Sequence, residues 1–396
     1  MTRSAETMES CQTPMPIRTS ILLRTVPALL GVACCLSAEG DRSSTAGQKY
    51  LEKLAVRVEE EAPFEVIVGV YCGRKWLSHF TLAASKAPAG SGGVLQLDVV
   101  SRIQRGGQVL LDTSRQLLDQ KWSTVRLETE IEIESVTMSR FSAVVLEGRW
   151  TGTLSVMGQA RAVEGDAGPG ACWGPRYLPW ILAPDEEVAL DEIGPNPRAF
   201  EYAADVEPHR GHVAHQKSEL RRGHLTEDGT DYLVLLNDSG QCIEMRAFEG
   251  TVVRFLRILP DQIGKDIEGP LDLTESQETI LRAALALQRG DREEWASQVD
   301  FESMISDVAK AATGDERRRM VEEVRTKAIE HAFVDAGRRD PVAEVSVRDE
   351  VATHSLAAEA GDRAVVRMYD QVYKLHRISD DKGEDRWLIV HFEKSK

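Results

Sequence analysis

The feature that most constrains the fold of this chain is a long series of short runs in which apolar and polar residues alternate, between Phe64 and Leu259. Runs such as GGVLQLDVVSRIQ, STVRLETEIEIESVTM and GTLSVMGQARAV alternate with a period of two, and glycine or serine stands between them. This alternation is typical of half-buried β-strands, and strands joined by such short loops pair antiparallel. No run is followed by a segment with a helical period. The pattern therefore predicts an antiparallel β-rich domain, either a half-barrel or a sandwich, and disfavours a doubly wound α/β fold.

Two local patterns refine this prediction at the ends of the series. Before it, apolar residues at i, i+3, i+4 and i+7 predict a short amphipathic helix that Pro63 ends; they are Leu51, Leu54, Ala55 and Val58. Near its end, TDYLVLLNDSGQCIEMRAF predicts a hairpin around the four residues 237–240, with Gly240 at a positive φ.

One aromatic segment interrupts the strands. GPGACWGPRYLPWILAPDEEV combines several prolines and glycines with large apolar residues, and proline disfavours regular strand pairing. Two interpretations stay open: a loop folded onto the core, or an apolar flap over a ligand cavity. On the second interpretation the ligand-binding candidates are Trp173, Tyr177, Trp180 and Ile181.

The composition becomes helical after a linker at 260–274. Thr274 and Gln277 have the spacing of a capping box ahead of ETILRAALALQRG, which ends at Gly290. A short helix after Asp291 and a longer one over DERRRMVEEVRTKAIEHAFVDAG follow. The remaining runs, VAEVSVRDEVA, SLAAEA, RAVVRMYDQVYKLHRI and RWLIVHFEK, are predicted to be strands. We therefore expect an α+β protein with a β-rich domain at 48–259 and a second α+β domain at 275–396.

The N-terminal segment has the composition of an export signal. MPIRTSILLRTVPALLGVACCLSAEG has arginines, then an apolar stretch, then small residues, and predicts cleavage after Ala38. The alternative is a buried apolar segment of a cytosolic protein. With residues 1–38 removed we expect an exported, periplasmic or extracytoplasmic protein, soluble because no later stretch is long and apolar enough to span a membrane. Cys72, Cys172 and Cys242 then remain, enough for at most one disulfide and too widely spaced for a zinc site.

Charge and motifs exclude several classes of function. The formal net charge is −16, which argues against nonspecific nucleic-acid binding because such binding needs a positive field. GSGG at 90–93 lacks the lysine and the helix of a phosphate-binding loop, and the serine at 239 lacks the frame of a nucleophile elbow. No cofactor is predicted.

A histidine-rich stretch, HRGHVAHQK, raises the question of a metal site. In a strand, His209 and His215 lie ~20 Å apart at ~3.3 Å per residue, and His212 points to the opposite face. Zinc needs its nitrogen ligands ~2 Å from one point, so a site here requires a sharp turn near Gly211 or ligands from elsewhere. We predict surface histidines on a β segment and no metal.

Two resemblances to known families rest on these patterns. The tail, with helices first, a Gly290–Asp291 loop, the strand GDRAVVRMY and the closing GEDRWLIVHF, resembles the cystatin-like cone superfamily that includes SnoaL-type cyclases and ketosteroid isomerases. The leading helix, successive hairpins and proline-rich crossover of the middle region loosely resemble the periplasmic lipoprotein-carrier half-barrel superfamily. The first resemblance implies a helix-backed curved sheet, and the second implies a sheet that holds acyl chains.

An acid–base enzyme of the cone type needs a buried carboxylate next to a hydrogen-bond donor. The tail offers Asp370, Tyr369, Tyr373, His376 and His391. Along an unbroken strand Tyr369 and Tyr373 share a face while Asp370 lies opposite, so no catalytic residues are assigned and the two tyrosines are ligand-binding candidates. The favoured hypothesis is a non-enzymatic protein that binds an apolar or amphiphilic, lipid-like ligand in a β-sheet cavity. The alternatives are a cofactor-free isomerase or cyclase in the cone pocket, and a structural or interaction module that forms a homodimer.

Overall fold

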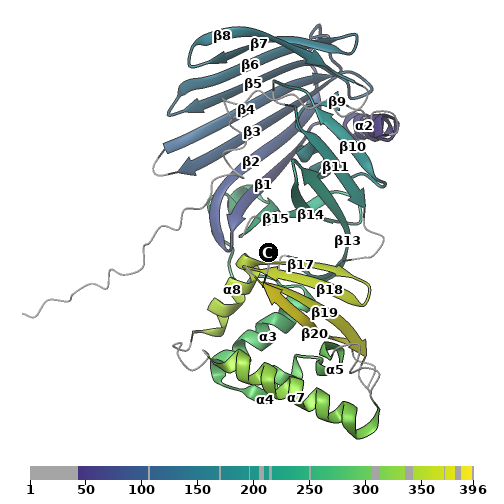
Figure 1. The fold of residues 1–396 in the computed structure, drawn as a ribbon. Helices are drawn as coiled ribbons and strands as arrows, with labels where there is room; N and C mark the ends of the chain where they lie inside the picture. The colour runs from purple at the N-terminus through teal and green to yellow at the C-terminus, as the bar shows by residue number, and fades with distance from the viewer. Residues whose placement is uncertain are drawn as a thin grey trace, which may run out of the picture. The chain divides into compact units, whose positions relative to one another are not determined.

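The computed structural model describes residues 43–394 apart from 106–107, 169–170, 196, 205–208, 214–215, 249–250, 306–312, 335–341, 370 and 380–384. This part of the protein is α+β, with one large and mainly antiparallel sheet and a separate four-stranded antiparallel sheet accompanied by helices (Figure 1). The predicted fold class is confirmed. The predicted export signal at 1–38 lies outside the described residues.

The large sheet has sixteen strands, most of which lie beside their neighbours in the chain. From β8 the order runs β7, β6, β5, β4, β3, β2, β1 and then β16, β15, β14, β13, β11, β10, β9, while β12 pairs with β13. Its strands are β1 (Phe64–Cys72), β2 (Lys75–Lys86), β3 (Leu95–Arg105), β4 (Gln108–Leu118), β5 (Thr124–Ile133), β6 (Val136–Leu146), β7 (Arg149–Val156), β8 (Gln159–Asp166), β9 (Ala171–Cys172), β10 (Val188–Glu192), β11 (Ala199–Ala204), β12 (His209–Val213), β13 (Gln216–Glu227), β14 (Thr230–Leu236), β15 (Cys242–Phe248) and β16 (Val252–Ile258). All of them belong to one continuous sheet rather than to the two separate sheets of a sandwich.

Tight turns explain why neighbouring strands pair. Four hairpins turn on two residues that both have positive φ, between 48° and 82°. This mirror-image geometry matches the right-handed twist of the flanking strands and therefore favours hairpins. The four pairs are Glu134–Ser135, Glu147–Gly148, Met157–Gly158 and Asp228–Gly229. The predicted hairpin of β14 and β15 is also present, with Gly240 at φ 74° as expected.

The leading helix, α2 (Ser43–Glu61), packs against β10 with the face that its apolar period predicted. Leu51, Leu54, Ala55 and Val58 are all buried. On the large sheet, a buried ion network joins Glu244 of β15 to Arg246, at 2.6 Å, and to Arg254 of β16, at 2.7 Å. Burial opposes ionisation of Glu244, but the two guanidinium groups outweigh it and lower the pKa of this carboxyl to about 2.

The histidine-rich stretch is β structure but not the single strand that we predicted. Residues 209–213 form β12, and residues 216–217 begin its antiparallel partner β13, with Val213 opposite Gln216. Gly211 pairs with Ser218 of β13 within the ladder, so the chain does not turn at this glycine. His209 lies opposite Leu220 and His212 opposite Lys217, while His215 lies outside the described residues.

Among the described residues of the last part of the chain, five helices precede a four-stranded sheet of order β17-β18-β19-β20. These elements are α3 (Glu275–Arg289), α4 (Arg292–Ser297), α5 (Phe301–Met304), α7 (Gly314–Phe333), α8 (Glu344–His354), β17 (Ser355–Ala360), β18 (Arg363–Met368), β19 (Gln371–Ser379) and β20 (Asp385–Lys394). The capping box predicted for Thr274 and Gln277 is present, and Gly290 ends α3 at φ 71°. We call this part of the protein, residues 275–394, the C-terminal module.

One predicted strand is wrong. The run VAEVSVRDEVA does not form a strand, because most of it belongs to helix α8. The alternation of Val345 and Val347 suggested a strand, but the buried side chains are Val347 and Val351, which have the i, i+4 spacing of one helix face. They pack with Leu281 and Leu285 of α3. Tertiary packing against α3 therefore decides the local structure.

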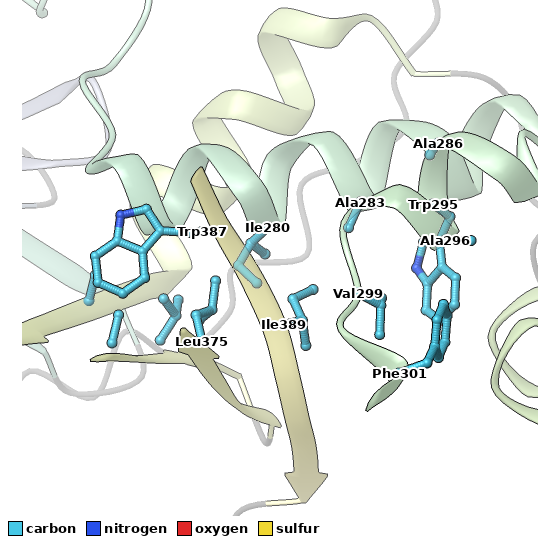
Figure 2. Packing of buried hydrophobic residues seen from close by; sticks show 13 residues of the cluster. Ile280, Ala283, Ala286, Trp295, Ala296, Val299, Phe301, Leu375, Trp387 and Ile389 are labelled. Atoms are coloured by element: carbon cyan, nitrogen blue, oxygen red, sulfur yellow. The ribbon is translucent and has the colours of Figure 1, made fainter. Parts of the chain in front are cut away.

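The core of the C-terminal module lies between its helices and one face of its sheet. Figure 2 shows Ile280 of α3, Leu375 of β19 and Ile389 of β20 close together in this cluster. Val299, which follows α4, forms an isolated bridge with Ile389. This contact ties the connection between α4 and α5 to the edge of the sheet.

Candidate functional site

The C-terminal module contains a partly open cavity of about 590 Å³, within the ~300–1,000 Å³ typical of small-molecule sites. Its walls come from α3, α4, α7, α8 and the strands β18 to β20. The lining residues are Ile280, Ala283, Ala284, Leu287, Gln288, Trp295, Val299, His331, Ala332, Val347, Glu350, Val351, Met368, Tyr369, Gln371, Tyr373, Ile389 and Phe392. Most are apolar, and the polar side chains are few, as in many ligand pockets.

The sequence of α3 explains why space remains here. Ile280, Ala283, Ala284 and Leu287 have the i, i+3, i+4, i+7 spacing of a single helix face, and this face lines the cavity. Two of these four residues are alanines, whose short side chains leave room between α3 and the sheet. A third alanine, Ala332 of α7, lines the cavity as well.

The polar part of the lining includes a carboxylate and a phenol that are hydrogen-bonded to each other. The hydroxyl of Tyr369 donates to Oε1 of Glu350 over 2.9 Å. The ring of Tyr369 stacks on His354, with centroids 4.7 Å apart and planes 23° apart. Tyr369 is at φ 54°, a left-handed backbone that is uncommon for a bulky residue and occurs often at functional sites. Helix α8 and the chain just after β18 therefore hold this pair of side chains in a defined geometry.

Burial and the hydrogen bond to Glu350 together raise the pKa of Tyr369, so its hydroxyl stays protonated and acts as a donor near neutral pH. Both members of the pair are exposed, and Tyr369 keeps 50% of its surface accessible. General base catalysis by a carboxylate at neutral pH needs a buried group whose pKa burial has raised. The exposed Glu350 does not have this environment.

The structure brings both predicted tyrosines of the tail, Tyr369 and Tyr373, into the cavity lining. They do not lie on one unbroken strand as expected, because Tyr369 follows β18 and Tyr373 belongs to β19. Asp370 lies outside the described residues, and His376 and His391 are not among the lining residues.

Sequence reasoning missed Glu350 and His331 as lining residues. Glu350 stood in a segment predicted to be a strand. A helical interpretation of that segment places Glu350 three residues after the buried Val347, next to it on the helix surface, and this signal could have found it.

The aromatic segment of the large-sheet region contains a 3-10 helix, η1 (Pro175–Trp180). Tyr177, Trp180 and Ile181 are buried, with exposed fractions of 7%, 1% and 2%, and Trp173 is half-buried. The rings of Tyr177 and Trp180 both lie edge-on to Phe80 of β2, while Trp173 stacks on Tyr177. Three of the four predicted residues, Tyr177, Trp180 and Ile181, are therefore buried in the core, and Trp173 packs on one of them.

A group of charged side chains adjoins this segment. Nη2 of Arg176 donates to the hydroxyl of Tyr177 over 2.8 Å, and Nη1 lies 3.9 Å from Oε1 of Glu227. Burial raises the pKa of Asp112 on β4 to about 6, against the opposing effect of Arg176. Burial likewise raises the pKa of Glu192 to about 6. The carboxylate of Glu227 on β13 thus lies close to the guanidinium of Arg176 on η1 and offsets its positive charge.

The described residues also bear on three other features, namely a metal site, a disulfide and a membrane-spanning helix. No group of three or more His, Cys, Asp or Glu side chains there could hold a metal ion. Cys72, Cys172 and Cys242 are free thiols. No helix among the described residues is long and apolar enough to cross a membrane.

Comparisons with known proteins identify no family. No family model and no curated protein matches the chain. Among solved structures, a β-barrel-like protein of a domain of unknown function (DUF1849) from Brucella abortus aligns with a TM-score of 0.35 and 11% identity. The alignment covers 50% of this chain and 95% of that protein. The resemblances to cone and lipoprotein-carrier proteins therefore stay predictions.

Proposed function

We propose that this protein binds a small apolar or amphiphilic molecule in the cavity of its C-terminal module. The observation that carries the proposal is the cavity itself, about 590 Å³ of space with largely apolar walls and a few polar side chains, among them the hydrogen-bonded pair Glu350 and Tyr369. Apolar walls favour a hydrocarbon portion of the ligand, because its transfer from water contributes ~25 cal/mol per Å² of buried area. A few polar groups then orient the rest of the molecule.

The cavity supports binding better than acid–base catalysis. An isomerase in this position needs a buried carboxylate, whereas Glu350 is exposed and engaged by Tyr369. A ligand under the aromatic segment of the large-sheet region is less well supported, because Tyr177, Trp180 and Ile181 are buried against neighbouring side chains. Export of the protein and homodimer formation stay separate proposals, tested by N-terminal sequencing of the secreted form and by light scattering.

The test is a substitution on α3 that places a large side chain in the cavity. Ala283 is buried and lines the cavity, so Ala283→Phe places a ring in the space a ligand would occupy. Binding of the neutral fluorescent probe N-phenyl-1-naphthylamine is measured by its emission and by energy transfer from the tryptophans of the protein, of which Trp295 lines the cavity. We expect one probe per chain and at least a tenfold weaker affinity in Ala283→Phe, with no change in Ala358→Phe on the exposed side of β17.

A second variant keeps the test valid if Ala283→Phe does not fold. Ala332→Trp adds bulk from α7, on another wall of the cavity and at a half-buried position. Probe binding that survives in both folded variants, or the absence of binding in the unaltered protein, would contradict the proposal.

A further inference from the structure

The charge of the cavity lining indicates which polar group the ligand carries. Among the described lining residues, Glu350 is the only carboxylate, and none is a lysine or an arginine. A ligand carboxylate or phosphate placed beside Glu350 would meet a like charge, with no lysine or arginine among the described lining residues to compensate it. The lining therefore disfavours anionic amphiphiles such as fatty acids.

Glu350 also has hydrogen-bonding capacity left. Its Oε1 accepts the hydroxyl of Tyr369, and no described residue donates to Oε2. An ionised carboxylate offers about four lone-pair positions over its two oxygens. At least one oxygen can thus accept a hydrogen bond from a ligand, while Tyr369 and its stack on His354 hold the carboxylate in place.

Aromatic side chains in the lining favour a positive charge. Trp295, Tyr369, Tyr373 and Phe392 come from four different elements or connections and all line the cavity. The negative faces of aromatic rings attract ammonium groups, and aromatic cages recognise methylated ammonium ligands in this way. The apolar side chains of Ile280, Val299 and Ile389, whose close packing Figure 2 shows, line the same cavity and suit a hydrocarbon chain.

We infer that the ligand is a cationic amphiphile, with an alkyl portion in the apolar part of the cavity and an ammonium group hydrogen-bonded to Glu350. This inference rests on the proposed function and adds the chemical class of the ligand. The carboxylate of Glu350 and the ring of Tyr369 that it contacts both attract an ammonium group, so the head group decides affinity among ligands of equal chain length.

The experiment compares three ten-carbon ligands that differ only in the head group: decylamine, decanol and decanoate. Each displaces N-phenyl-1-naphthylamine from the full-length protein at pH 7, below its micelle-forming concentration. An alkylamine is charged at this pH, as a lysine side chain is. We expect decylamine to bind at least tenfold more tightly than decanol, and decanoate to bind more weakly than both.

Glu350→Gln removes the charge and keeps the shape of the side chain. In this variant we expect the affinity for decylamine to fall to that for decanol, while the affinity for decanol stays unchanged. Glu344→Gln is the matched control, because Glu344 lies on the same helix but outside the lining, and it should preserve the preference for the amine.

The outcomes separate the two proposals. Decanol binding without a preference for decylamine, or a preference that survives in Glu350→Gln, overturns the assignment of the head group and leaves the binding function standing. Failure of all three ligands and of the probe to bind refutes the proposed function itself.

Discussion

The folded protein disfavours the ionised form of the Asp112 side chain, so removal of this charge should stabilise the protein at neutral pH. It lies on β4, on the same face of the sheet as its register partners Ser101 and Ile131. It makes no hydrogen bond to any described residue, and burial raises its pKa from 3.8 to about 6, against the opposing effect of Arg176.

The sign of the effect follows from proton binding. Between pH 4 and 6 the folded protein binds more protons at Asp112 than the unfolded chain does, so stability falls as pH rises through this range. The stability that protonated Asp112 contributes to the folded protein is fully present below about pH 4 and is lost above about pH 6. A rise of the pKa from 3.8 to about 6 corresponds to ~3 kcal/mol at ~1.4 kcal/mol per pH unit. Water still reaches the half-buried side chain, so we expect roughly 1–2 kcal/mol.

The perturbation is Asp112→Asn, which keeps the shape of the side chain and removes its charge. Urea unfolding at pH 8 should show this variant ~1–2 kcal/mol more stable than the unaltered protein, and unfolding near pH 4 should show little difference. Asp238→Asn, in the exposed turn after β14, is the control and should leave both values unchanged. Glu192, whose pKa is also raised to about 6, keeps part of the pH dependence in the variant. Equal or lower stability of Asp112→Asn at pH 8 would refute this reasoning.

Three further predictions concern the packing of the large sheet. Glu244→Gln leaves two buried guanidinium groups without their carboxylate and should lower the free energy of unfolding by ~3–5 kcal/mol in urea titrations; a loss under 1 kcal/mol would show that the network is hydrated. Trp180→Ala removes a fully buried ring and should cost ~3–5 kcal/mol in the same assay, whereas a flap that opens freely would tolerate it. Gly152→Ala places a Cβ atom against the carbonyl oxygen of Ser142 and should lower the melting temperature by several degrees, while Gly168→Ala, whose Cβ would meet nothing within 4 Å, should not.

Local patterns in the sequence were sufficient to predict much of the secondary structure. The period-two runs and the glycine or serine residues between them predict the strands of the large sheet and their antiparallel pairing, because strand alternation and turn preference are properties of a few adjacent residues. The capping box at Thr274 and Gln277 and the glycine at 290 mark both ends of α3 for the same reason. The segment at 344–354 shows the limit of this approach, because Val345, Val347 and Val351 fit a strand and a helix almost equally well.

The candidate site was only partly predictable. Tyr369 and Tyr373 were singled out as hydrogen-bond donors that a cone-type domain could place in its pocket, and both line the cavity. Glu350 was not found, because its position depends on whether its segment is helical. The bend of the chain at Tyr369, with a positive φ, has no signal in a residue type that rarely adopts it.

The sequence by itself therefore determines the α+β class, the hairpin series and the capped helix α3, all of which follow from contacts within a few residues. The tertiary structure decides that residues 344–354 form a helix, because Val347 and Val351 are buried only against α3. It also decides that the alanines of α3 and α7 leave space between the helices and the sheet, and that Glu350 meets Tyr369 nineteen residues away. Such long-range contacts depend on how whole elements pack, which no local pattern records.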